Sequence, residues 1–182
     1  SEPDLLTDLI NDEGVTMAGG VPTVWLPLLK YVEESGRNLK PMTRAAIGGS
    51  ACPVSMMQEF RDVHAITVLH AWGMTEMSPI GTLNTPKRSN IDLPEIEKDD
   101  LFQSVGRPVP GVELKITDDD GNELPWDGEA FGALKVRGPW VIGDYYKLGK
   151  SSDAHEADGW FNTGDVATID GEGYVRITDR TK

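Results

Sequence analysis

An aromatic ring, a hydroxyl and a carboxylate lie within five residues of one another where an apolar run ends, in the segment WGMTE (residues 72–76). The glycine at position 73 permits a sharp turn, and the indole of Trp72 offers a face on which a base could stack. Thr75 supplies a hydroxyl for a phosphoryl oxygen, and Glu76 supplies a carboxylate of the kind that suits Mg²⁺. The alternative is a core tryptophan followed by a turn that Thr75 and Glu76 cap. Composition alone leaves both interpretations open.

A second segment with small side chains, GGSA (residues 48–51), follows the short apolar run AAI. At Gly48, Gly49 and Ser50 no side chain is larger than a hydroxymethyl group, so a flat ligand could lie against the backbone. The alternative is a tight turn between a strand and a helix that Pro53 opens. Taken alone, this segment favours the turn.

A third candidate is Asp165, which follows Thr163 and Gly164 just before a predicted strand. An aspartate in such a position can accept hydrogen bonds from both hydroxyls of a ribose. Its alternative is an Asx-turn, in which the carboxylate bonds the neighbouring backbone, and the residues alone favour that alternative. Arg180 ends the second strand of a predicted hairpin, where it could support the same sugar or phosphate or simply be solvated.

The remaining reactive side chains give weak signals. The three histidines have no spacing typical of zinc ligands, so no zinc site is expected. The acidic run that begins at Asp118 indicates a solvated turn, because the pattern of a calcium loop is not completed. Cys52 is the single cysteine and has no neighbouring histidine, so we expect a small buried side chain and no internal disulfide.

The first half of the chain alternates between helix and strand patterns. Helices are predicted over residues 3–12, 22–35 and 53–63, and strands over residues 15–19, 43–47 and 65–72. Leu5, Leu6, Leu9 and Ile10 form one helical stripe, and Pro27 should kink or split the second helix. This order predicts a parallel α/β sheet portion over residues 1–90.

The pattern changes near residue 90. Residues 90–100 are acidic and unpatterned, which indicates a loop or linker. Beyond them apolar residues recur with a spacing of two, and the segment DGEG (residues 170–173) joins two strands as a hairpin. We therefore predict a small antiparallel β subdomain over residues 91–182, which is either barrel-like or a curled sheet.

Composition limits the classes of partner. The formal net charge is −13, which repels phosphate backbones and anionic bilayers, so we expect no nucleic-acid partner. No run of about 18 apolar residues is present, so we expect no membrane span. The chain lacks a starting methionine and a leader-like run, and both ends look cut, so we expect a fragment of a longer protein. The free thiol and the missing leader favour the cytoplasm.

Five collinear segments resemble core motifs of the adenylate-forming superfamily, which contains acyl-CoA synthetases, adenylation domains and luciferases. They are GGSACP, AWGMTEMSP, SVGRPVPGVELKI, LKVRGPWVIGDYY and GWFNTGDVATIDGEGYVRITDRTK. The resemblance is strongest to the fatty-acyl and related CoA ligases. It implies the C-terminal part of the α/β subdomain of a large domain, followed by a β subdomain that ends at a hinge.

The resemblance also assigns roles to residues. It implies that Trp72 lies along the adenine, that Thr75 contacts the α-phosphate and that Glu76 holds Mg²⁺. It implies that Asp165 binds the ribose, with Arg180 assisting and Lys182 at the hinge. The remaining expected nucleotide-site residues are Gly48, Gly49, Ser50, Ala71, Gly73 and Ile177.

The implied activity is ATP-dependent activation of a carboxylic acid to an acyl-adenylate, followed by transfer to CoA. Adenylation of an amino or aryl acid for a carrier protein, and a non-catalytic nucleotide-binding module of the same fold, are the alternatives. The resemblance places the phosphate loop and the catalytic lysine outside these residues, so the chain alone should be inactive. Two departures from the family pattern, Ala133 and Asp144, are expected to lie away from the nucleotide contacts.

Overall fold

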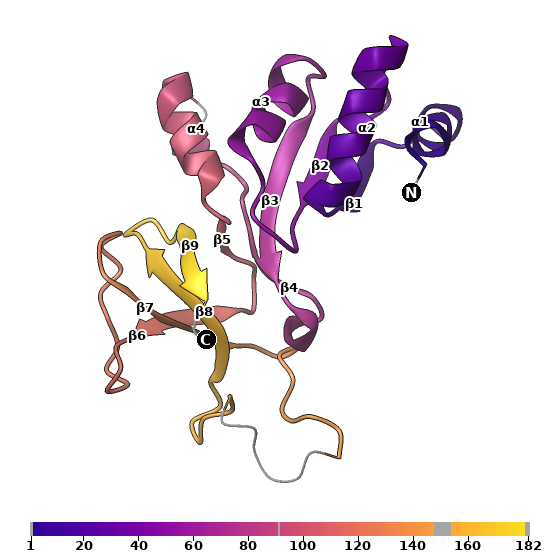
Figure 1. Ribbon diagram of the computed structural model, residues 1–182. Coiled ribbons are helices and arrows are strands. Elements are labelled where there is room, and N and C mark those ends of the chain that lie inside the picture. Colours follow the sequence, from indigo (N-terminus) through magenta and orange to yellow (C-terminus); the bar gives the residue numbers. More distant parts are fainter. Residues whose placement is uncertain (1, 91, 148–153, 181–182) are drawn as a thin grey trace. The chain divides into compact units, whose positions relative to one another are not determined.

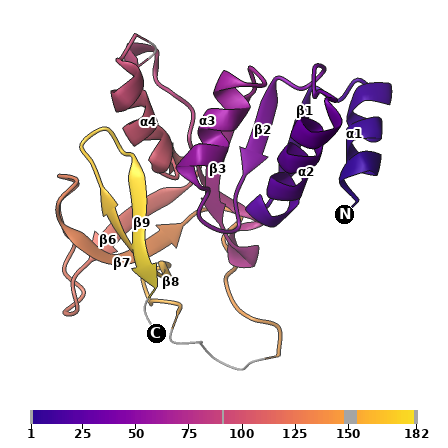
Figure 2. The same ribbon diagram turned by 45° about the horizontal axis from the view of Figure 1, so that its top comes forward.

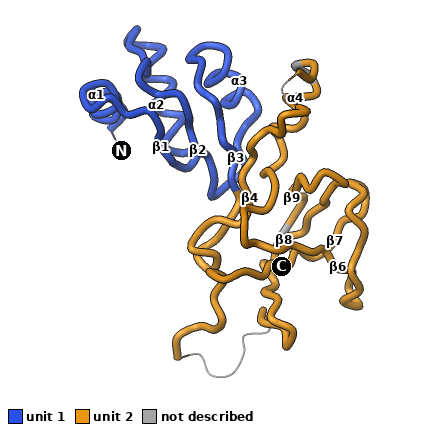
Figure 3. The backbone as a smooth tube through the Cα atoms, turned by 180° about the vertical axis from the view of Figure 1, so that it is seen from behind, with its two compact units in different colours: residues 1–71 blue, residues 72–182 orange. Residues whose placement is uncertain are grey.

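The chain divides into two compact units, unit 1 (Ser1–Ala71) and unit 2 (Trp72–Lys182), and each is described by itself (Figure 3). The computed structural model describes residues 2–90, 92–147 and 154–180, without the side chains of residues 95, 96 and 180. The predicted hinge residue Lys182 therefore lies outside the described residues. The change in sequence pattern near residue 90 lies inside unit 2.

Unit 1 contains the predicted parallel sheet. The strands β1 (Met17–Gly20), β2 (Arg44–Ile47) and β3 (Thr67–Gly73) run parallel, with β2 between the other two (Figure 1). Ala45 and Ile47 of β2 are fully buried. Parallel neighbours require crossovers, and helices α2 (Pro22–Ser35) and α3 (Val54–Asp62) supply them. The prediction of a parallel α/β portion is confirmed.

The two crossover helices pack against each other and lie side by side (Figures 1 and 2). The rings of Trp25 in α2 and Phe60 in α3 meet edge to face with their centroids 5.4 Å apart. A Cβ atom on Gly20 would lie 3.1 Å from the indole nitrogen of Trp25, so a glycine at the end of β1 lets α2 approach the strand closely. Large apolar side chains of both helices thus form the core of unit 1.

The first helix, α1 (Pro3–Asp12), begins with a proline at its first position, as such helices often do. Ile10 is buried, but Leu5 and Leu9 are 59% and 55% exposed. The predicted apolar stripe is therefore only partly covered within this chain.

Helix α2 runs through Pro27 as a single element, so the helix is not split there. Proline removes the hydrogen bond to the carbonyl of Thr23 four residues earlier. Both Thr23 and Pro27 lie on the exposed side of the helix, where water can bond that carbonyl. The continuous helix thus loses one bond at a position where the loss costs little.

Unit 2 contains a helix and a strand pair that the sequence did not predict. Strand β4 (Ile80–Leu83) pairs antiparallel with β5 (Arg107–Pro108). Between them lies α4 (Glu95–Gln103), so the prediction of a loop over residues 90–100 is wrong for this part. The amide nitrogen of Asn84, which is fully buried, donates to the carbonyls of Leu101 and Ser104 and so satisfies the end of the helix.

The rest of unit 2 is an antiparallel sheet in the order β6-β7-β8-β9 (Figure 1). Its strands are β6 (Glu113–Thr117), β7 (Phe131–Arg137), β8 (Phe161–Ile169) and β9 (Val175–Arg180). The predicted hairpin joins β8 to β9. Within the described ranges no pairing joins the edge strands β6 and β9, so the sheet is open and is not a closed barrel. The prediction of antiparallel β structure in this part of the chain is confirmed. In those ranges no helix combines the length and apolar character needed to cross a bilayer.

Candidate active site

The indole of Trp72 and the carboxylate of Asp165 meet although 93 positions separate them in the sequence. Trp72 Nε1 donates a hydrogen bond to Asp165 Oδ2 at 2.8 Å. Trp72 is 8% exposed and Asp165 is 2% exposed, so the bond lies inside unit 2. A buried carboxylate needs hydrogen-bond donors, and the indole N–H is one of them. The two segments predicted to hold a nucleoside therefore converge.

Two glycines allow Trp72 to lie where it does. A Cβ atom on Gly73 would be 1.9 Å from the carbonyl oxygen of Pro79, so only glycine fits where the chain doubles back. A Cβ atom on Gly81 would be 2.6 Å from the Trp72 ring, so the ring packs directly on the β4 backbone. Met77, which is fully buried, belongs to the same core cluster. Trp72 is thus a core residue, and its stacking on adenine stays a prediction.

The corner that carries Asp165 is shaped by its neighbours on β8. The Asp165 N–H donates to Thr163 Oγ1 at 3.1 Å, and the Gly164 N–H donates to Asn162 Oδ1 at 3.1 Å. Gly164 adopts φ = 74°, which glycine tolerates best. The side chains that bond the local backbone are therefore those of Asn162 and Thr163, while Asp165 Oδ2 reaches Trp72. Asp165 pairs with Arg180 in the register of β8 and β9.

Thr75 and Glu76 lie on a short 3-10 turn (Thr75–Met77) directly after β3. Thr75 is exposed and Glu76 is half-buried. No side chain caps this turn, so the alternative in which Thr75 and Glu76 form a capping pair is wrong. Both residues lie just past the carboxyl end of β3, where ligands of open α/β sheets bind.

Glu76 is held by a residue that the sequence analysis did not single out. The phenol of Tyr145 donates to Glu76 Oε1 at 2.8 Å, and the Ile142 N–H donates to the Glu76 carbonyl at 2.9 Å. The hydrogen bond to Glu76 raises the pKa of Tyr145 above its usual value, with burial and the carboxylate charge acting in the same direction. The neighbouring Asp144 is exposed and accepts a hydrogen bond from the Tyr145 N–H, so it is Tyr145 and not Asp144 that contacts Glu76.

The donor set around Glu76 fits Mg²⁺ rather than a metal held wholly by protein. In the parts of the chain that the structure describes, no group of three or more histidine, cysteine or acidic side chains could hold a metal. Mg²⁺ usually keeps several waters and is bound through one or two carboxylates together with substrate phosphates. A single half-exposed carboxylate beside the Thr75 hydroxyl matches that requirement.

The predicted residues of unit 1 lie together at the ends of β2 and β3. A Cβ atom on Gly48 would be 2.9 Å from the Ala71 carbonyl oxygen, so glycine permits this close approach. Gly49 adopts φ = 79°, and Ser50 is exposed. These features agree with a tight turn before α3, and a ligand contact at these residues stays a prediction.

Cys52 follows the same turn and is 8% exposed. Burial raises the pKa of its thiol to about 11. Because the thiolate is the reactive form, this cysteine is a poor nucleophile near neutral pH. The prediction of a small buried side chain is confirmed.

The last predicted contacts lie on β9. Ile177 is partly buried and packs against the core of unit 2. The side chain of Arg180 lies outside the described part of the chain, as does Lys182. Their predicted roles therefore stay predictions.

A family model described as AMP-binding enzyme matches residues 1–146. This chain belongs to that family. The resemblance to the adenylate-forming superfamily, drawn from five motifs, is thereby confirmed.

Two curated relatives of this chain are CoA ligases. The chain is 51% identical over 177 residues to a medium-chain-fatty-acid–CoA ligase of Ectopseudomonas oleovorans, covering 97% of this chain and 32% of that protein. It is 50% identical over 184 residues to a 3-methylmercaptopropionyl-CoA ligase of Ruegeria lacuscaerulensis, covering 99% of this chain and 34% of that protein. The chain thus spans about a third of the length of the curated relatives it matches.

A solved structure with a similar fold carries ligands. The O-succinylbenzoate coenzyme A synthetase of Bacillus subtilis, in complex with ATP and a magnesium ion, matches with a TM-score of 0.77 and 29% sequence identity. The match covers 99% of this chain and 34% of that one. The fold of the chain is therefore that of a segment of such synthetases.

Proposed function

We propose that this chain is part of an AMP-forming acyl-CoA ligase, which activates a fatty or related aliphatic acid with ATP and transfers it to CoA. The observation that carries the proposal is the hydrogen bond of 2.8 Å between Trp72 and Asp165. This bond joins the segments that contain Trp72 and Asp165, and each of these segments matches a motif that is assigned to the same nucleoside. Membership of the AMP-binding enzyme family and the two CoA ligases among its relatives support the same activity.

In the first half-reaction an oxygen of the substrate carboxylate attacks the α-phosphorus of ATP in line. A new O–P bond forms, the bond to the β-phosphate breaks, and the products are an acyl-adenylate and pyrophosphate. There is little covalent chemistry for the protein to perform, so the side chains act by positioning and by stabilising charge. Thr75, exposed at the end of β3, would donate its hydroxyl to an α-phosphate oxygen.

Glu76 and Asp165 would fix the two ends of the nucleotide. Mg²⁺, when bound, neutralises phosphate charge, and Glu76 would supply its protein ligand. Asp165 would accept hydrogen bonds from the ribose hydroxyls. Since Asp165 is 2% exposed in this chain, the groups that cover it must move aside when the nucleotide enters.

In the second half-reaction the thiol sulfur of CoA attacks the acyl carbonyl carbon of the adenylate. A thioester bond forms, the bond to AMP breaks, and the thiol proton is released. The resemblance places the phosphate loop and the catalytic lysine in other segments of the protein. We therefore propose that the 182 residues alone form no adenylate. The free thiol of Cys52 and the use of ATP and CoA support a cytoplasmic location.

Release of pyrophosphate by the full-length protein tests the proposal. We expect release that depends on an aliphatic acid from a panel of chain lengths and branched or sulfur-containing acids, with a thioester formed when CoA is added. Release that occurs only with amino or aryl acids, and no thioester, would favour an enzyme that loads a carrier protein. Binding of ATP without release for any acid would favour a non-catalytic nucleotide-binding module.

A further inference from the structure

A short segment after β7, which we call the strap (residues 140–145), is bonded along the turn that carries Glu76. The Ile142 N–H donates to the Glu76 carbonyl at 2.9 Å. Ser78 Oγ donates to the Trp140 carbonyl at 3.2 Å, and Trp140 Nε1 donates to the Ile80 carbonyl at 3.3 Å. The hydrogen bond of 2.8 Å from the Tyr145 phenol to Glu76 Oε1 completes this set. Main chain and side chain of Glu76 are thus held by one segment.

The ring of Tyr145 packs against other aromatic side chains of unit 2. Its ring meets the ring of His155 edge to face at 5.9 Å, and the ring of His155 meets Phe161 at 5.0 Å. His155 Nε2 lies 3.0 Å from the Ile142 carbonyl oxygen, which ties the same ring to the strap. Phe161 is 3% exposed and belongs to the core. The position of the Tyr145 phenol is therefore set by edge-to-face ring contacts that run through His155 to Phe161 in the core.

We propose that Tyr145 is a positioning residue for Glu76, holding its carboxylate in the orientation that binds the metal of the nucleotide. The inference rests on the proposed function, because it concerns the same site. The phenol occupies Oε1, and no hydrogen bond from the described part of the chain reaches Oε2. The oxygen that remains is the one for the metal.

The physical basis is loss of rotational freedom before the ligand arrives. A glutamate side chain loses conformational entropy when it is fixed in one orientation. A phenol that holds one carboxylate oxygen removes much of this cost from the binding step. Partners of this kind around metal ligands typically contribute about 10-fold to 100-fold in metal affinity or activity.

The test uses the full-length protein and measures binding, not turnover. Mn²⁺ is titrated by calorimetry in the presence of α,β-methylene-ATP, which cannot be cleaved at the α-phosphorus. Tyr145→Phe removes only the hydroxyl and keeps the ring that packs on His155. We expect Mn²⁺ affinity to fall about 10-fold, while nucleotide affinity without metal stays within about 2-fold.

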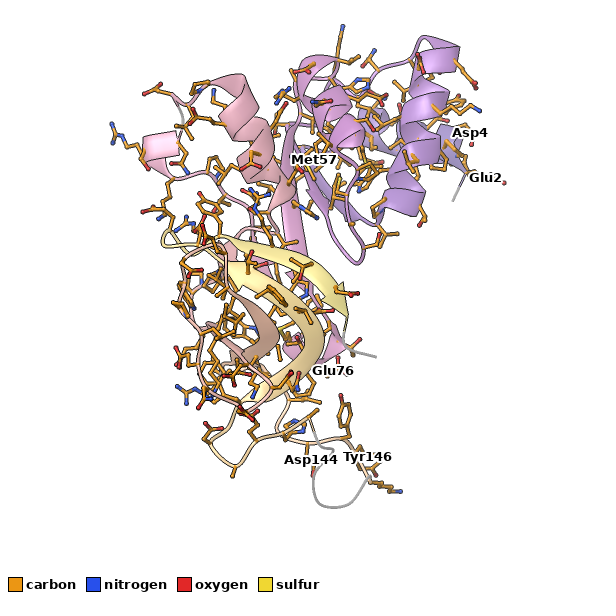
Figure 4. All side chains as sticks on the ribbon, turned by 60° about the vertical axis from the view of Figure 1, so that its left-hand side comes forward. Glu2, Asp4, Met57, Glu76, Asp144 and Tyr146 are labelled. Atoms are coloured by element: carbon orange, nitrogen blue, oxygen red, sulfur yellow. The ribbon has the colours of Figure 1, made fainter. Side chains whose placement is uncertain are left out.

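Tyr146→Phe is the matched control. It makes the same chemical change one residue along, at a side chain that is 87% exposed and projects outward (Figure 4). We expect its Mn²⁺ affinity to equal that of the parent protein. Glu76→Gln supplies the second control, because Tyr145→Phe should have no further effect on Mn²⁺ once that carboxylate is gone.

Each result of these titrations either supports or overturns the proposed role of Tyr145. Unchanged Mn²⁺ affinity in Tyr145→Phe, an equal loss in Tyr146→Phe, or an undiminished loss in the Glu76→Gln background would each overturn the role of Tyr145 and leave the proposed function standing. A parent protein that binds neither the nucleotide nor Mn²⁺ would overturn both. Thermal unfolding of each variant, measured in parallel, separates a binding defect from a folding defect.

Discussion

Asp165 and Glu76 are both carboxylates proposed to hold one nucleotide, and the chain treats them in opposite ways. Asp165 is 2% exposed and accepts a hydrogen bond from the Trp72 indole inside the core. Glu76 is half-buried and accepts a hydrogen bond from the Tyr145 phenol at the edge of the fold. At the nucleoside end, the carboxylate proposed to bind the ribose also makes a buried hydrogen bond, to Trp72, that stabilises the fold. At the phosphate end, the strap supports the side chain while water still reaches it. Changes at the first end should therefore affect stability and binding together, and changes at the second should affect binding alone.

Asp165→Ala should have the largest effect. It leaves the buried indole N–H of Trp72 without this acceptor and opens a cavity, so the free energy of unfolding should fall by about 2–4 kcal/mol. Affinity for MgATP should fall about 100-fold, because two hydrogen bonds to a charged group are lost. Thermal unfolding and calorimetry on the full-length protein measure the two quantities.

Asp165→Asn is the control for that experiment. An amide oxygen can still accept from the indole, so most of the stability should return while nucleotide affinity stays low. Equal losses of stability in both variants would contradict the importance of the bond between Trp72 and Asp165.

Trp72→Phe should have the next largest effect on stability. It removes the donor of the same hydrogen bond. The change keeps an aromatic ring but withdraws a donor from a buried carboxylate, which should cost about 1.5–3 kcal/mol of stability. Combined with Asp165→Asn, the loss should be smaller than the sum of the single losses, because both changes weaken one interaction. If the stability losses of the two single variants simply added in the double variant, Trp72 and Asp165 would not act through one interaction. The proposed contrast between Asp165 and Glu76 would then fail.

Tyr145→Phe extends the comparison to the exposed end. We expect the free energy of unfolding to change by less than about 1 kcal/mol, because water can replace the phenol at a half-exposed carboxylate. The loss of Mn²⁺ affinity described above should therefore occur in a protein of nearly normal stability. A loss of stability as large as that of Trp72→Phe would remove the distinction between the two ends.

Thr75→Ala should have the smallest effect on stability. Its side chain is exposed, so the free energy of unfolding should change by no more than about 0.5 kcal/mol. The rate of pyrophosphate release should nevertheless fall about 10-fold, since one donor to the α-phosphate is lost. Thr75→Ser keeps the hydroxyl and should retain the parent rate, and a slow serine variant would argue against the proposed contact.

Periodicity was sufficient for the elements that form by local rules. The parallel strands of unit 1 and the hairpin between β8 and β9 follow from apolar spacing and turn residues. Helix α4 was missed because it has no apolar stripe, although Pro94 directly before an acidic first turn is a helix-start signal. Closure of a barrel could not be judged, because spacing along strands does not determine how edge strands pair.

The site was predicted one half at a time. Trp72, Thr75 and Glu76 stood out because they lie where a predicted strand ends, and Asp165 because it lies just before one, each with a side chain able to bind a ligand. Tyr145 did not, because it lies 69 positions from Glu76 and only the fold brings them together. The burial of Asp165 was equally hidden, since an aspartate after Thr-Gly gives no sign that an indole will cover it.

The bond between Trp72 and Asp165 gives the protein a natural optical probe. Indole emission depends on how the ring nitrogen is bonded and on how dry its surroundings are. If ribose hydroxyls engage Asp165, the charge beside this indole is redistributed, and the emission spectrum should shift when the nucleotide binds. Subtracting the spectrum of Trp72→Phe isolates that signal from the other four tryptophans, so occupancy could be followed in real time without a label.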